Sequence, residues 1–105
     1  MADLFKMLQQ AQQMQARLQQ MQEELQQKSV SGTAGGGMVT VEADGRGQIR
    51  AVKLDPSLVA GTDREMLEDL IVVAVNDAQK KAGELAKQEM GKISGGMDLP
   101  FKLPF

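Results

Sequence analysis

Among the acidic residues of this sequence, Glu65, Glu68 and Asp69 are the candidates for a pair of carboxylates that could act in general acid–base catalysis. Glu68 and Asp69 are adjacent and would point to different sides of a helix, whereas Glu65 and Asp69 would share an exposed face. Acidic residues interact favourably with the N-terminus of a helix, and this structural role explains the cluster without a catalytic or metal-binding one. The chain has no histidine and no cysteine, which removes imidazole bases, thiol nucleophiles and the usual zinc ligands. We therefore predict no catalytic residue, no metal site, no cofactor and no small-molecule substrate.

Basic residues are distributed unevenly in a chain whose formal net charge is −2. Five lysines and three acids lie between Lys80 and the end of the sequence, and residues 46–53 contain three bases and no acid. Attraction for a polyanion must therefore come from local patches and not from the total charge.

The first segment is predicted to be a long helix with a heptad seam, because apolar residues recur at alternating steps of three and four. The seam consists of Leu4, Met7, Ala11, Met14, Leu18, Met21 and Leu25. So narrow a stripe pairs with another helix and does not wrap into a globular core.

Three antiparallel strands are predicted next, at Lys28–Ala34, Met38–Ala43 and Gln48–Leu54. Alternation places Val39, Val41 and Ala43 on one face of the middle strand. In the third strand it places Arg50, Val52 and Leu54 on one face and Ile49, Ala51 and Lys53 on the other. The glycines between the first two strands lack the Lys-Ser/Thr ending of a phosphate loop, so they predict a turn.

A second long helix is predicted from Thr62, the N-cap of a capping box completed by Glu65, to about Met90, with Gly91 as the stop. Its segment Leu70–Val75 is apolar on every side, so it needs two covers: the sheet and, most simply, a second copy of the protein. The alanines of its apolar stripe would let the N-terminal helix approach closely. The residues predicted for dimer or helix packing are Leu70, Ile71, Val75, Ala78, Ala82 and Leu85.

The predicted organisation is an α+β helix–sheet–helix domain over residues 1–93, followed by a flexible tail over residues 94–105. The tail ends in Leu99–Phe105, whose prolines preclude helix. Its two phenylalanines suggest docking onto a groove, and a disordered end is the alternative. No apolar run exceeds the six residues of Leu70–Val75, and no signal peptide begins the chain, so we expect no membrane association and a cytoplasmic location.

The order of these elements resembles the YbaB/EbfC family of bacterial nucleoid-associated proteins. The residues that carry the likeness are Leu4–Met21, Gly36–Val39, Val52–Pro56, Leu67–Leu70 with Ala74–Ala78, and Ser94–Met97. The resemblance implies a homodimer whose long helices project like the arms of tweezers. It also implies binding of double-stranded DNA with low sequence specificity, location at the nucleoid, and an influence on nucleoid organisation or gene expression.

Local charge then selects the candidate DNA contacts, because the family has no short contact motif. They are Arg17, Lys28, Lys80, Lys81 and Lys87, with Lys6 and Lys92 as weaker choices. Arg46, Arg50 and Lys53 are predicted to lie on the sheet surface and not at DNA. The alternative function is that of a protein adaptor, whose Met- and Gln-rich helix would capture a partner's amphipathic helix.

Overall fold

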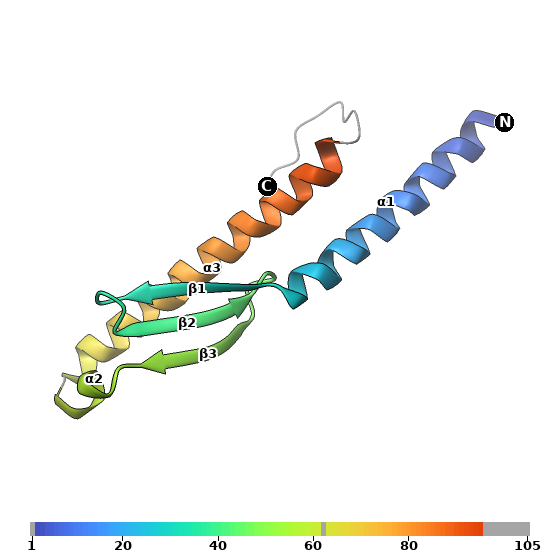
Figure 1. Cartoon of the computed structure of the whole chain (residues 1–105). Coiled ribbons are helices and arrows are strands. Elements are labelled where there is room, and N and C mark those ends of the chain that lie inside the picture. Colours follow the sequence, from blue (N-terminus) through green and yellow to red (C-terminus); the bar gives the residue numbers. More distant parts are fainter. Residues whose placement is uncertain (1, 62, 96–105) are drawn as a thin grey trace.

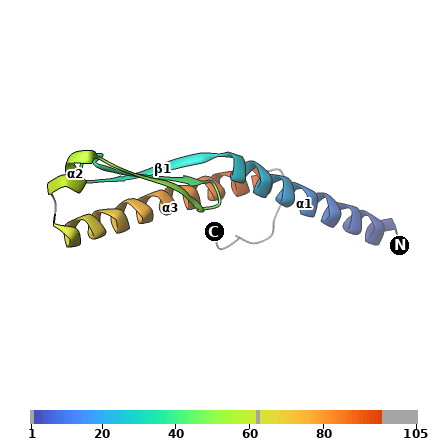
Figure 2. The same ribbon diagram turned by 90° about the horizontal axis from the view of Figure 1, so that it is seen from below.

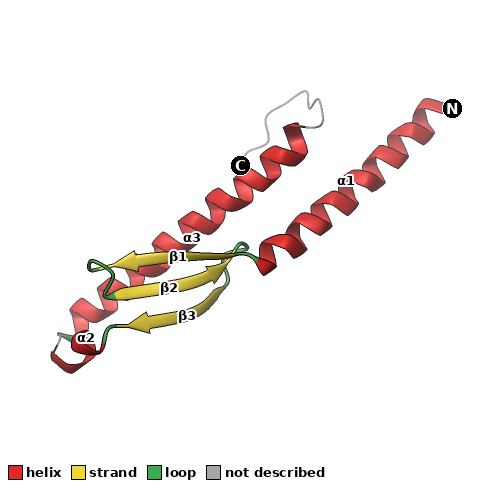
Figure 3. Ribbon diagram, viewed as in Figure 1, coloured by secondary structure: helices red, strands yellow, loops and turns green. Residues whose placement is uncertain are grey.

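The computed structural model describes residues 2–61 and 63–95 as two long helices and a small sheet (Figures 1 and 3). The predicted α+β class, with a three-stranded antiparallel sheet between two long helices, is confirmed. The predicted cap Thr62 and most of the tail lie outside the described residues. The elements are α1 (Ala2–Gln27), β1 (Ser29–Ala34), β2 (Val39–Asp44), β3 (Ile49–Leu54), α2 (Pro56–Gly61) and α3 (Arg64–Gly95).

The sheet has the order β1-β2-β3, and α3 packs against one of its faces (Figure 2). Val39, Val41 and Ala43 point to this face and are fully buried, as the alternation predicts. The helix lies mainly under β1 and β2. The inner face of β3 is therefore covered less, and Val52, which pairs with the buried Val41, remains 45% exposed.

A bulge in the β2–β3 pairing corrects the predicted faces of β3. Glu42 pairs with Ala51 but Ala43 pairs with Ile49, so Arg50 is the extra residue. The extra residue turns Ile49 onto the face of Ala43, where it packs against the core. Simple alternation placed Ile49 with Ala51 and Lys53, because a period of two cannot register an inserted residue.

Strand β1 and helix α3 approach so closely at Gly32 that no side chain fits between them. A Cβ atom on Gly32 would lie 2.2 Å from the amide nitrogen of Ala78 and 2.3 Å from the carbonyl oxygen of Ala74. Ala74 and Ala78 are fully buried. The alanine stripe, expected to face the N-terminal helix, thus begins beneath the sheet, because small residues suit the approach of a strand as well as that of a helix.

The remaining residues predicted for packing lie on or near this buried face of α3. Leu70, Ile71 and Val75 are partly buried against the core. Ala82 is buried beside Leu25 of α1, and Leu85 is half-buried.

Only the second half of α1 packs against the rest of the protein. Met21 and Leu25 are buried, and the Leu25 carbonyl accepts a hydrogen bond of 2.8 Å from the amide of Gly45. Leu4, Met7 and Leu8 are more than half exposed. The first half of α1 extends past the end of α3 (Figure 2). The radius of gyration is consequently 19.5 Å, compared with about 13 Å for a compact domain of this size.

The ends of α3 differ from those predicted. Asp63 caps the helix, since its Oδ1 accepts a hydrogen bond of 3.0 Å from the amide of Glu65. The helix continues through Gly91 to Gly95, because a glycine lowers helix stability without ending a helix of 32 residues. The short helix α2, which the Asp55-Pro56 stop signal did not predict, begins at Pro56, a favoured first helical residue.

Replacing Gly32 with alanine should lower the free energy of unfolding by about 1–3 kcal/mol, because the Cβ atom would collide with the α3 backbone. Urea unfolding at fixed protein concentration measures the change. Gly83→Ala is the matched control: its Cβ would meet nothing within 4 Å, so it should leave stability unchanged or raise it. Equal effects of the two substitutions would contradict the close approach.

The turn carboxylate of Asp44 should make stability sensitive to acid. Burial raises its pKa, but hydrogen bonds from the Gln48 and Arg46 amides and from Arg50 outweigh this and lower the pKa below the ordinary 3.8. A lowered folded-state pKa stabilises the protein above the ordinary value, and that contribution is lost as the pH falls through the folded-state value.

Asp44→Asn should therefore be less stable than the parent at pH 7 and lose less stability on acidification. Urea unfolding at pH 7 and at acid pH measures both differences. Parallel losses in the two proteins would show that Asp44 is not a source of the acid sensitivity.

Candidate nucleic-acid interface

The predicted DNA contacts divide into bases that form ion pairs within the fold and bases that form none in the described part of the chain. Lys28 forms an ion pair of 2.7 Å with Glu89, and Lys81 forms one of 3.2 Å with Asp77. No ion pair joins Arg17, Lys80 or Lys87 to another residue of the described ranges. The structure thus separates two groups that sequence alone treated as equivalent.

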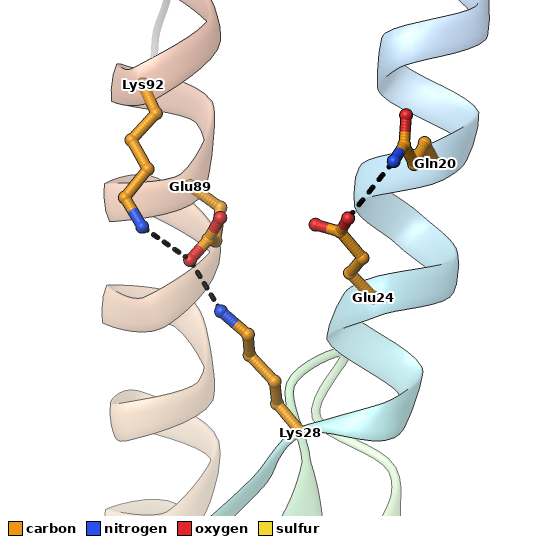
Figure 4. Close-up of polar contacts among 5 residues, drawn as sticks. All are labelled: Gln20, Glu24, Lys28, Glu89 and Lys92. Carbon is orange, nitrogen blue, oxygen red and sulfur yellow. Dashed lines mark hydrogen bonds and ion pairs between the residues drawn. The ribbon is translucent and has the colours of Figure 1, made fainter.

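Lys28 joins the end of α1 to α3 through Glu89 (Figure 4). Glu89 is largely buried and also accepts a bond of 3.2 Å from Lys92. Hydrogen bonds from Lys28 and then from Lys92 lower the pKa of this carboxyl below its ordinary value, against the effect of its burial. Because both lysines share one carboxylate, this cluster keeps a net single positive charge and anchors α1 to α3.

Lys81 binds the free edge of β1 and pairs with Asp77. Its ammonium donates a hydrogen bond of 3.0 Å to the Ser31 carbonyl, while Asp77 accepts one of 3.0 Å from the Thr33 amide. The hydrogen bond from Thr33, followed by that from Lys81, lowers the pKa of Asp77. The pair therefore satisfies backbone groups that an edge strand would otherwise expose.

Lys80 and Lys87 project from the outer face of α3. They are seven residues apart, which places them on one side of the helix about 10 Å apart along its axis. Both are exposed. This side of the helix faces away from Ala74 and Ala78, so the two ammonium groups can approach an anion without disturbing the core.

A groove borders this lysine face where α1 meets α3 and the β2–β3 turn. One part has a volume of about 470 Å³ and is lined by Gln22, Arg46 and Gln79, among others. A second, apolar part of about 280 Å³ shares Gln22 with it and is bordered by Lys87 and Met90. The groove therefore brings polar side chains of α1 and α3 beside exposed bases.

Arg46 differs from the other two bases of the predicted sheet-surface patch. Arg50 pairs with Asp44 at 3.2 Å and Lys53 pairs with Glu42 at 2.9 Å, in agreement with a sheet-surface role. Arg46 instead lies exposed at the groove, with no ion pair to a described residue. The Asp44-Gly45-Arg46-Gly47 turn was recognisable, but only the approach of α1 and α3 gives the turn a groove.

Arg17 lies on the other side of the α1–α3 contact, in a separate hollow of about 290 Å³. Glu24, Glu89 and Lys92 line the same hollow. Two carboxylates therefore accompany Arg17, which makes its surroundings less positive than those of Lys80 and Lys87.

Other kinds of site find no support within the described ranges. No group of three or more acids could hold a metal ion across residues 2–61 and 63–95. In the same part of the chain, no helix combines the length and apolar character needed to cross a membrane.

Comparisons with known proteins agree with this arrangement. Residues 1–97 match the YbaB/EbfC DNA-binding family. A nucleoid-associated protein of Gemmatimonas aurantiaca is 58% identical over 103 residues, which cover 98% of this chain and 99% of the relative. A nucleoid-associated protein of Desulfotalea psychrophila is 46% identical over 98 residues, or 93% and 92% of the two chains. The crystal structure of an uncharacterized Helicobacter pylori protein has a TM-score of 0.74 at 26% identity, covering 90% of this chain and 97% of that one. This chain belongs to the YbaB/EbfC DNA-binding family.

Proposed function

We propose that the protein binds double-stranded DNA as a homodimer, with low sequence specificity, through the lysine face of α3 and the adjoining groove. The observation that carries this proposal is the set of exposed bases Arg46, Lys80 and Lys87, which lack ion pairs within the described ranges. The names of the family and of its nucleoid-associated relatives support the same ligand and a location at the nucleoid.

Low specificity follows from the kind of side chain at this surface. Lysine and arginine ion pairs to phosphate fix the position of a protein on DNA but read no sequence. Gln22 and Gln79 can add hydrogen bonds from the groove. Each protomer has few such cations, so its affinity for DNA would be modest. A second set of the same cations in a partner protomer would double the number of phosphate contacts.

A second copy would cover apolar surface that one copy leaves exposed. The inner face of β3 extends beyond α3, which exposes Val52. On α3, Val72 is 57% exposed beside the partly buried Ile71 and Val75. These residues lie at the end of the molecule opposite the free part of α1. A dimer joined there would leave both lysine faces and both α1 arms open to solvent.

Two DNA sites held at a fixed separation by such a dimer would bend a duplex or bring two segments together. Changes of DNA conformation of this kind would influence nucleoid organisation and the expression of nearby genes. The deformation would have its own sequence-dependent energy, which gives a modest preference without base contacts.

Replacing Lys80 and Lys87 with glutamine should weaken duplex binding and flatten its salt dependence. Six phosphate contacts per dimer give a slope of log K against log salt of about −5, and the two contacts left would give about −2. Fluorescence anisotropy of labelled duplex between low and moderate salt measures both slopes.

The double variant Lys53→Gln with Arg64→Gln is the matched control, because it removes the same charge from bases that form ion pairs. It should retain the steep slope. Equal weakening by both double variants would reject the lysine face as the contact. An absence of binding at low salt would reject DNA binding itself and favour the adaptor function.

Replacing Val72 with aspartate should convert the dimer to a monomer, because it would bury a charge in the proposed interface. Val73→Asp is the matched control: Val73 is similarly exposed but lies about 100° around the helix. Sedimentation velocity should show a halved mass for the first variant only. A monomeric parent protein, or an unchanged Val72 variant, would contradict this interface.

A further inference from the structure

The free half of α1 exposes a continuous apolar face that nothing in the described structure covers. Leu4, Met7, Leu8 and Ala11 follow the spacing of one helix face, and all four are exposed. Leu4 and Met7 are 61% and 65% exposed. The face continues into Met14 and Leu18, which become partly buried where α3 begins to accompany α1.

The last turns of α3 lie beside α1 about two turns from this face. Lys92 and Ile93, in the last turns of α3, line the same hollow as Arg17 and Met21 of α1. The two helices run in opposite chain directions (Figure 1). The last turns of α3 therefore approach the part of α1 that contains Arg17. The segment that follows, residues 96–105, is thus tethered about two turns of α1 from the uncovered face.

The sequence of this segment suits an extended chain with one apolar side. Apolar residues occupy every second position: Met97, Leu99, Phe101, Leu103 and Phe105. The polar residues and both prolines fall between them, and each proline favours an extended backbone at the leucine before it.

The lengths also match. From Met97 to Phe105 an extended chain spans about 26 Å. From Arg17 back to Leu4, α1 rises about 20 Å.

We propose that the segment Met97–Phe105 docks along the apolar face formed by Leu4, Met7, Leu8 and Ala11 of α1 in the same chain. A tether at Gly95 gives the segment a high effective concentration at this face, which favours it over a second copy or another protein. The docked segment ties the end of α3 to the free part of α1 and sets the spacing of the two helices. This inference does not depend on DNA binding.

Paired cysteines test the contact directly, because the chain contains no cysteine of its own. The full-length variant Ala11→Cys with Leu99→Cys should form a disulfide within one chain under mild oxidation. Gln13→Cys with Leu99→Cys is the matched control, since residue 13 lies on the opposite side of α1 at nearly the same height. The intrachain product should exceed that of the control by about tenfold.

Non-reducing electrophoresis and peptide mass spectrometry distinguish the outcomes. A disulfide between two chains would overturn the proposal, because a second copy would then be the occupant. Equal yields from the test and control pairs would also overturn it.

Hydrogen exchange provides a second measurement without cysteines. Phe101→Ser with Phe105→Ser should accelerate amide exchange in residues 4–14 about tenfold, and Lys102→Ser should not. The acceleration should be the same at all protein concentrations, since the docking is within one chain. Unchanged exchange in the phenylalanine variant, or protection that depends on concentration, would contradict docking in the same chain.

Discussion

The close approach of β1 to α3 at Gly32 is the contact on which the rest of the architecture depends. Stacked sheets pack about 10 Å apart, but here the backbones of β1 and α3 meet at Gly32, above the buried Ala74 and Ala78. The helix is thereby held under β1 and β2, so β3 extends past it. The same placement directs the outer face of α3 toward solvent and lets its last turns run beside α1. This close approach therefore accounts for the exposed inner face of β3, for the lysine face of α3 and for the groove between α1 and α3.

Charge in this protein has two uses, and the structure separates them. Lys28, Lys81 and Lys92 form ion pairs that join α1 to α3 or cap the edge of β1. Because these cations share their charge with Glu89 and Asp77, they attract a polyanion less than unpaired lysines do. Lys80 and Lys87 lie on the side of α3 that forms no ion pair within the described part of the chain. A chain with an overall negative charge can therefore still present a local positive surface, and its affinity for phosphate would depend on where ion pairs are absent.

Much of the fold could be predicted because it depends on local periodicity. The heptad from Leu4 to Leu25 determines a long helix, and alternation around Val39 and Val41 determines a strand with one buried face. The predictions failed where one residue changes a register or a partner. The inserted Arg50, for example, moves Ile49 to the core. The alanine stripe was recognised as a close-packing surface, but a strand and a helix impose the same demand for small side chains.

The sequence by itself determined the fold class and the absence of histidine and cysteine chemistry, which follow from short-range spacing and from composition. It also carried the resemblance to the family, in the order and identity of its motifs. Only the tertiary structure decided that Lys28 is compensated by Glu89, 61 residues away, and that Asp77 accepts a hydrogen bond from the Thr33 amide, 44 residues away. It also placed Arg46 at the groove and left Val52 uncovered. Contacts between distant segments depend on how α3 is placed against the sheet, and no local sequence pattern encodes that placement.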